Sequence, residues 1–127
     1  MKYGISKKVR TGYDETVIKV TEELKKEGFG VLTTIDVRDT LKKKLDVDFP
    51  RYVILGACNP PFAHKSLQAE EELGLLLPCN VIVYEKEGAV TVSAFDPTTM
   101  SAIVENPAVG EIAAEVKSRL ERVVAAV

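Results

Sequence analysis

The chain has 127 residues, of which 46% are hydrophobic and 28% are charged. Seventeen Lys and Arg against nineteen Asp and Glu leave a formal net charge of −2. This balance excludes a protein that binds nucleic acid through bulk positive charge, and the hydrophobic content excludes a disordered chain. The length fits a single domain over residues 1–127, which can bury a core without help from a metal ion or a disulfide.

The N-terminal residues lack the apolar segment of a signal peptide, and no stretch reaches the ~20 apolar residues that span a bilayer. We therefore expect a cytoplasmic protein without a membrane partner. In that compartment Cys58 and Cys79 should be reduced. A structural disulfide is then disfavoured, and a reactive, ligating or buried thiol is favoured.

The chain begins with the pattern of a strand followed by a helix. Residues 3–9 alternate weakly between apolar and polar side chains, which favours a half-buried strand. Apolar side chains then recur at helical spacing over residues 13–24. Thr11 is the expected N-cap of this helix because an acid follows three residues later, and Gly28 stands where the helix would stop.

A second strand and a short helix are expected next. The β-branched run over residues 29–35 favours a strand, and Asp36 is suited to cap a helix with apolar residues on one face. Three consecutive lysines, residues 42–44, lie on that helix. Neighbouring aspartates offset their charge, so we interpret them as a solvated face and not as an anion site.

A continuous apolar run over residues 51–58 predicts a strand that is buried on both faces and central in the sheet. Asn59 is a favoured N-cap, and the two prolines after it are tolerated in a first turn. A helix is therefore expected from about residue 60 to residue 72, before Gly74 ends it.

The rest of the chain predicts a hairpin and a long helix. Strands over residues 79–85 and 89–95 are joined by a Lys-Glu-Gly segment that is short enough for a tight turn. Asp96 begins another helical turn, and Asn106 caps a last helix with a long apolar stripe. That stripe would bury the sheet or a partner.

The expected order of elements is β-α-β-α-β-α-β-β-α. Strands that alternate with helices ordinarily favour a parallel doubly wound sheet. Here, however, two of the intervening helices are short and the only tight connection is a hairpin. We therefore expect a two-layer α+β domain with a mainly antiparallel five-stranded sheet packed by helices.

Most familiar catalytic motifs are absent from the sequence. It contains neither a glycine-rich dinucleotide fingerprint nor a P-loop, and no GxSxG accompanies its only histidine, His64. Two cysteines and one histidine are one ligand short of a closed structural zinc site. The scattered carboxylates single out no acid–base pair, so the sequence leaves open whether the protein is an enzyme.

The residues that could carry chemistry gather around the two cysteines. Cys58 ends a buried strand directly before a helix N-terminus, where the helix dipole favours a thiolate. Gly56 leaves room for a group to approach the backbone, and Asn59 is expected to cap the helix through its side-chain oxygen. If the strand before Cys58 and the strand after Cys79 are antiparallel, the two thiols can meet; if they are parallel, the thiols lie far apart.

His64 falls in the first full turn of the helix that follows Cys58. It would complete a Cys-Cys-His ligand set if its side chain turned towards the thiols. The alternative is a surface residue without a role.

The segments Gly56-Ala57-Cys58-Asn59-Pro60, Leu77-Pro78-Cys79 and Asp96-Pro97 resemble the domain-of-unknown-function 302 family, and the resemblance covers essentially the whole chain. It implies a small α+β fold with an antiparallel sheet, similar to the TATA-binding-protein-like architecture, and a homodimer. A likeness of fold carries no expectation of nucleic-acid binding. The family has no established activity, so the resemblance marks these residues as its signature without giving them a role, and His64 does not match the signature.

Three functions are compatible with these observations. We favour a homodimeric binding module that holds a small organic ligand or a soft metal ion near the two thiols. The alternatives are a thiol redox enzyme in which one cysteine attacks and the other resolves, and a structural or interaction protein in which both thiols only pack. The expected ligand-binding residues are Gly56, Cys58, Asn59, Cys79 and Asp96, and the expected metal ligands are Cys58, Cys79 and His64.

Overall fold

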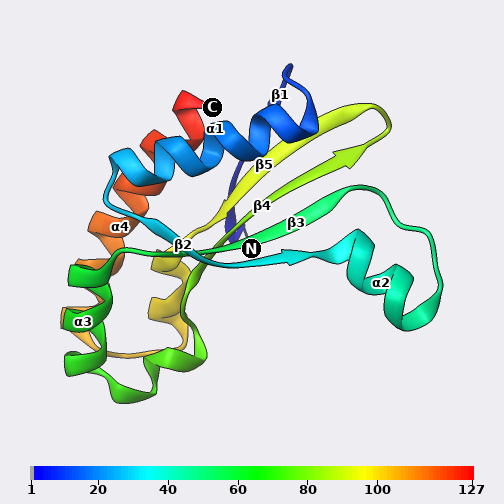
Figure 1. Ribbon diagram of the computed structural model, residues 1–127. Helices are drawn as coiled ribbons and strands as arrows, with labels where there is room; N and C mark the ends of the chain where they lie inside the picture. Colours follow the sequence, from blue (N-terminus) through cyan, green and yellow to red (C-terminus); the bar gives the residue numbers. More distant parts are fainter. Residues whose placement is uncertain (1) are drawn as a thin grey trace.

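Every strand of the structure pairs antiparallel with its neighbours. The computed structural model describes residues 2–127 and places the strands in the order β1-β5-β4-β3-β2 (Figure 1). The predicted α+β class, the predicted element order and the antiparallel five-stranded sheet are confirmed. The strands are β1 (Gly4–Val9), β2 (Gly30–Asp36), β3 (Tyr52–Cys58), β4 (Cys79–Lys86) and β5 (Ala89–Phe95).

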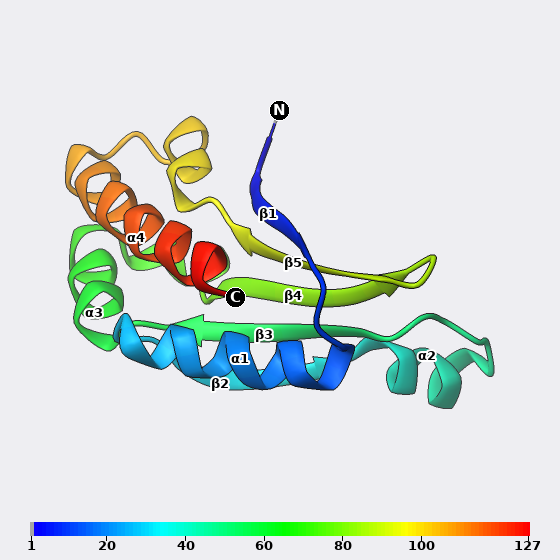
Figure 2. The same ribbon diagram turned by 90° about the horizontal axis from the view of Figure 1, so that it is seen from above.

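The helices of the described chain occupy two places. Two long helices lie across one face of the sheet, and the remaining segments, apart from α2, gather at the end where β3 stops and β4 starts (Figures 1 and 2). Within residues 2–127 no helix is both long and apolar enough to cross a membrane. The elements are α1 (Tyr13–Lys26), α2 (Val37–Leu45), α3 (Pro60–Ala69), α4 (Pro107–Ala126) and the 3-10 helices η1 (Glu71–Leu75) and η2 (Pro97–Ala102).

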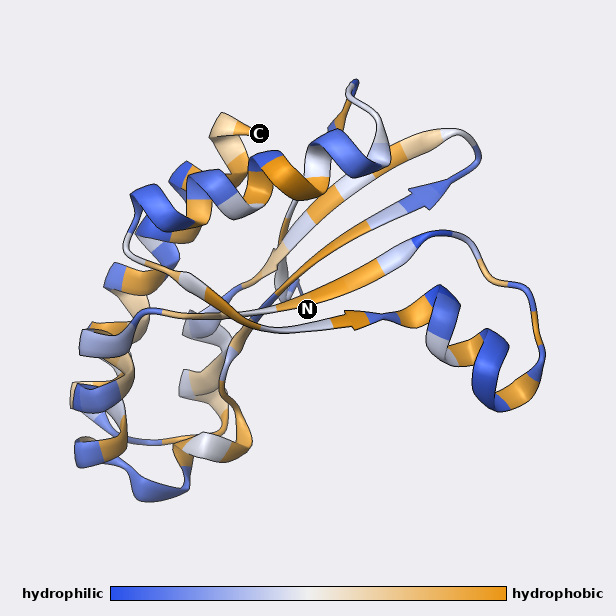
Figure 3. Cartoon of the chain, viewed as in Figure 1, coloured by the Kyte–Doolittle hydropathy of each residue, from blue (hydrophilic) through white to orange (hydrophobic). Residues whose placement is uncertain are grey.

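The core lies between the sheet and the two long helices, α1 and α4. Hydrophobic residues concentrate in the central strands (Figure 3). Alternate side chains of β3 and β4 face the helices and are buried, and the register sets them opposite one another: Val53 with Val83, Leu55 with Val81, and Ala57 with Cys79. Val20 and Leu24 of α1 and Leu120 of α4 fill the helix side of this layer.

Two local predictions differ from the structure. The N-cap of α1 is Gly12, and the hydroxyl of Thr11 forms a hydrogen bond with Thr16 Oγ1 (2.7 Å) instead of capping the helix. The helix after Asn59 ends at Ala69 and not at residue 72. A contact from far along the chain accounts for this early end, because Asn106 Nδ2 donates to the carbonyl oxygen of Ala69 (2.9 Å).

The short helix α2 projects from the sheet on the side away from α3 (Figures 1 and 2). Asp36 caps it as predicted, since its Oδ1 accepts from the amide of Asp39 (2.9 Å). The lysines pair with nearby aspartates, Lys43 with Asp39 (2.9 Å) and Lys42 with Asp46 (3.0 Å), as expected for a solvated face. None of the residues of α2 is buried.

Gly56 of β3 lies between Thr33 of β2 and Pro78, the residue before β4. Its register partner on β2 is Thr33. A Cβ atom at position 56 would overlap Thr33 Oγ1 and would stand 3.0 Å from Pro78 Cγ. The space beside this glycine is therefore filled by neighbouring side chains, and not kept free for a ligand as the sequence suggested.

Replacing Gly56 by alanine should lower the free energy of unfolding by about 1–3 kcal/mol, because the new methyl group must displace Thr33 and Pro78. Urea denaturation followed by circular dichroism measures the loss. Gly30→Ala is the matched control, since no atom lies within 4 Å of a Cβ built at this strand glycine. Equal effects of the two substitutions would contradict this account of the packing.

Candidate functional site

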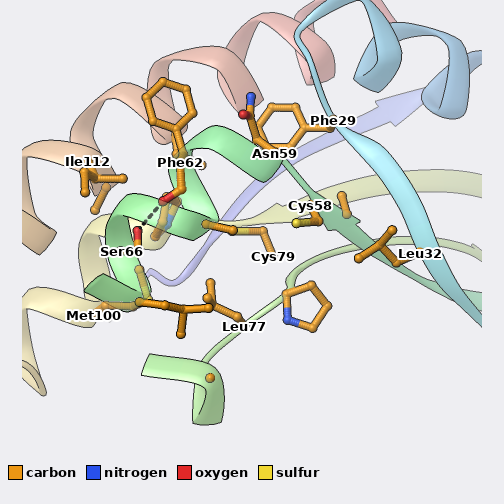
Figure 4. A pocket seen from close by; sticks show the side chains of 18 of the residues that line it. Phe29, Leu32, Cys58, Asn59, Phe62, Ser66, Leu77, Cys79, Met100 and Ile112 are labelled. Atoms are coloured by element: carbon orange, nitrogen blue, oxygen red, sulfur yellow. Dashed lines mark hydrogen bonds between the residues drawn. The ribbon is translucent and has the colours of Figure 1, made fainter. Parts of the chain in front are cut away.

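The two cysteines lie at the same end of the sheet. Because β3 and β4 are antiparallel and Ala57 is the register partner of Cys79, Cys58 stands one residue beyond that pair. Both thiols are free, and both line one pocket (Figure 4). The antiparallel arrangement on which the predicted proximity depended is therefore present.

The pocket is a cavity of about 330 Å³ at the end of the sheet. Its walls come from β2, β3 and β4, from α3, and from η2 with the first half of α4. The lining residues are Phe29, Leu32, Thr33, Ala57, Cys58, Asn59, Phe62, Ala63, Ser66, Leu67, Gly74, Leu77, Pro78, Cys79, Pro97, Met100, Val109, Ile112, Ala113 and Val116.

The lining is almost wholly apolar. Among the residues that surround the cavity in the described chain there is no Lys, Arg, His, Asp or Glu. The polar side chains are Thr33, Asn59 and Ser66, together with the two thiols. Such a surface favours the burial of an apolar molecule and offers few groups to orient it.

Burial keeps one of the two thiols neutral. Cys79 is 7% exposed, and this burial raises the pKa of its thiol to about 11, with a smaller contribution from the charge of Cys58. Cys79 is therefore a thiol and not a thiolate at neutral pH. Since the thiolate is the nucleophile in disulfide exchange and the ligand of soft metals, the environment of Cys79 disfavours both roles.

Asn59 begins α3 but does not cap it with its side chain, contrary to the prediction. Pro61, the second residue of the helix, has no backbone N–H, so one of the two usual capping donors is missing. The amide group instead donates from Nδ2 to the carbonyl oxygen of Glu27 (3.3 Å). Asn59 thus ties the start of α3 to the end of α1.

Arg119 of α4 joins the same junction. Its Nη1 donates to the carbonyl oxygen of Glu27 (3.0 Å), and its guanidinium lies 5.0 Å from the centre of the Phe62 ring. Phe62 in turn lines the cavity. The left-handed conformation of Gly28 (φ +88°) lets Asn59 approach closely, because a Cβ there would stand 3.0 Å from Nδ2.

Asp96 does not line the cavity, although Pro97 beside it does. It caps η2, where its Oδ1 accepts from the amide of Thr98 (2.9 Å), and it pairs with Lys117 (2.9 Å). Partial burial acts to raise the pKa of Asp96, but the hydrogen bonds from Thr98 and Lys117 outweigh it and hold the pKa below its usual value. Asp96 therefore fixes the turn behind the pocket wall.

His64 is exposed on α3 and does not line the cavity. Phe62, Ala63 and Ser66 turn towards the cavity, which leaves position 64 on the solvent side of the helix. Within residues 2–127 no group of three His, Cys, Asp or Glu side chains could hold a metal ion. The structure therefore does not bring Cys58, Cys79 and His64 together as the predicted metal set.

Sequence reasoning missed most of the pocket wall. The first half of α4 supplies Val109, Ile112 and Val116 to the cavity, whereas its second half packs on the sheet through residues such as Leu120. The sequence signal for this wall was the length of the apolar stripe of α4, which is longer than the part of the helix that the sheet covers. Met100 in η2 gave no such signal.

The chain matches the family described as Domain of unknown function DUF302 over residues 5–127. It is similar to a solved structure described as the crystal structure of uncharacterized conserved protein DUF302 from Bacillus stearothermophilus, with 35% sequence identity and a TM-score of 0.91. The similarity covers 98% of this chain and 98% of the other. No curated protein matches the chain. Neither description names a ligand or an activity.

The thiol of Cys79 should react slowly in the folded protein. In a Cys58→Ser variant at pH 8, alkylation by iodoacetamide should proceed at about a hundredth of the rate in the urea-unfolded chain, because the pKa is raised from 9.0 to about 11. Unfolding then releases a proton above pH 9, so the stability linked to this thiol is present below pH 9 and is lost as the pH rises towards 11. Equal rates in the folded and unfolded chains would show that Cys79 is an ordinary accessible thiol.

Proposed function

We propose a binding function for this chain, which belongs to the DUF302 family. The ligand is a small, largely apolar organic molecule held in the pocket beside Cys58 and Cys79. One observation carries the proposal: an apolar cavity of about 330 Å³ lies between α3, η2, the first half of α4 and the end of the sheet. Protein interiors leave few voids larger than a water molecule, and ligand sites begin at roughly 300 Å³.

Binding is favoured over catalysis by what lines the cavity. General acid–base chemistry needs a titratable group within reach of the ligand, and no carboxylate or imidazole of the described residues faces the cavity. The thiol redox alternative needs a second cysteine that forms a thiolate, and burial opposes this at Cys79. A soft metal ion would need the same thiolate and a third ligand, so we restrict the proposal to an organic molecule.

An uncharged fluorescent dye, N-phenyl-1-naphthylamine, tests the proposal. It should bind with one site per chain and with a rise in fluorescence, because the cavity is apolar and can hold aromatic rings. Ala63→Phe should weaken binding at least about tenfold, since the new ring occupies the cavity. The matched control is His64→Phe, one residue along the same helix and outside the lining, which should bind the dye like the unaltered protein.

The dye experiment has two outcomes that would defeat the proposal. One is the absence of saturable binding to the unaltered protein. The other is equal binding by the Ala63→Phe and His64→Phe variants, which would place the dye elsewhere on the surface. Circular dichroism of both variants checks that they are folded.

We also propose that the protein is a homodimer, as the family resemblance implies. The exposure of α2 supports this. A helix of nine residues is marginal in water without packing, yet none of its residues is buried and Leu45 is 66% exposed. A second copy of the chain would cover these side chains.

Sedimentation equilibrium measures the state of association. The expected result is twice the mass of the chain, with a shift towards the single-chain mass in a Leu45→Ser variant because a covered apolar side chain is lost. Lys44→Ser is the control at the neighbouring position and should sediment like the unaltered protein. A single-chain mass for the unaltered protein would contradict the proposal.

A further inference from the structure

The pocket provides no partner for a charged ligand group. The described residues that line it include no Lys, Arg, His, Asp or Glu, and burial keeps Cys79 protonated at neutral pH. Three charged side chains of α4 are already paired: Arg119 with Glu115 (3.0 Å), Arg122 with Glu27 (2.9 Å) and Lys117 with Asp96 (2.9 Å). An ammonium or a carboxylate would therefore lose its water without gaining a counter-ion.

Two polar side chains of the pocket each donate one hydrogen bond to a backbone carbonyl. Ser66 Oγ donates to the carbonyl oxygen of Phe62 (2.7 Å), and Asn59 Nδ2 donates to the carbonyl oxygen of Glu27 (3.3 Å). A bond from serine to the preceding helical turn is common, and it leaves the lone pairs of the hydroxyl free. Thr33 is the remaining hydroxyl, and it lies on the exposed edge strand where water reaches it.

The Ser66 hydroxyl can accept a hydrogen bond inside the cavity. It is 6% exposed, and it lies among Phe62, Ile112 and Met100, with its hydroxyl bonded to the Phe62 carbonyl (Figure 4). A ligand group that only accepts, such as an ether, gains nothing from this oxygen. A ligand hydroxyl can donate to it.

The volume of the cavity limits the size of the ligand. A cavity of about 330 Å³ lies at the lower end of the roughly 300–1,000 Å³ range of ligand pockets, so it holds a small molecule of at most about three rings. An eight-carbon chain with one hydroxyl fits within this space.

We infer that the ligand is an uncharged apolar alcohol whose hydroxyl donates a hydrogen bond to Ser66. This inference rests on the proposed function and names the chemical class that the same pocket selects. Ser66 is then the residue that sets specificity, and the surrounding apolar side chains supply most of the affinity.

Displacement of N-phenyl-1-naphthylamine by four matched molecules tests the inference. They are 1-octanol; its isomer 1-methoxyheptane, which cannot donate; octylammonium; and octanoate. The alcohol should bind about five- to tenfold more tightly than the ether, the effect of one neutral hydrogen bond. The two ions should bind at least about a hundredfold more weakly than the alcohol, because nothing in the lining compensates their charge.

A Ser66→Ala variant should bind the alcohol and the ether equally, while its affinity for the ether is unchanged. The fold should persist, because the Phe62 carbonyl keeps its helical partner within α3. Ser101→Ala, an exposed serine outside this pocket, should keep the preference for the alcohol. Circular dichroism and dye binding check that both variants are intact.

Three results would overturn the inference: equal binding of alcohol and ether by the unaltered protein, a preference for the alcohol that survives in Ser66→Ala, and an ion that binds as tightly as the alcohol. If the dye binds but none of the four molecules displaces it, the inference also fails while the proposed function stands. If the dye itself does not bind, the proposed function has failed.

Discussion

The antiparallel pairing of β3 with β4, in which Ala57 faces Cys79, determines where the pocket forms. Because the two strands run in opposite directions as neighbours, the connection over residues 59–78 leaves and returns at the same end of the sheet. The connection is too long for a hairpin turn, so it folds into α3 and η1 beside the sheet. The other side is closed by η2 and the first half of α4. The cavity is the space between these two elements, α3 and the end of the sheet.

The cavity stays open because hydrogen bonds hold both ends of α3 in place. At its start, Asn59 donates to the carbonyl oxygen of Glu27 at the end of α1. At its end, Asn106 donates to the carbonyl oxygen of Ala69. Arg119 reinforces the first junction through the same carbonyl of Glu27 and through the ring of Phe62. Since buried polar groups are costly to leave unpaired, these contacts oppose the collapse of α3 onto the sheet, which would otherwise bury more apolar surface.

The strands, most helices and their order could be predicted from the sequence because each depends on local patterns, such as the hairpin after β4 or the Asp36 cap. The prediction that the two cysteines lie at the same end of the sheet followed from the prediction that β3 and β4 are antiparallel. The hydrogen bonds that hold the two ends of α3 could not be predicted, since Asn59 and Asn106 donate to carbonyls more than thirty residues away in the sequence. The capping rule gave a wrong prediction at Asn59, where Pro61 removes one of the two N–H groups that the rule assumes.

The central claim is that a small molecule binds in the cavity between α3, α4 and the end of the sheet, which the hydrogen bonds at both ends of α3 keep open. Titration of isotope-labelled protein with N-phenyl-1-naphthylamine, followed by amide correlation spectra, tests it most directly. The account predicts saturable shifts for the amides of Phe62, Ser66 and Ile112, and constant positions for the amides of α2, which lies away from the pocket. Spectra that do not change, or shifts that are largest in α2, would contradict it.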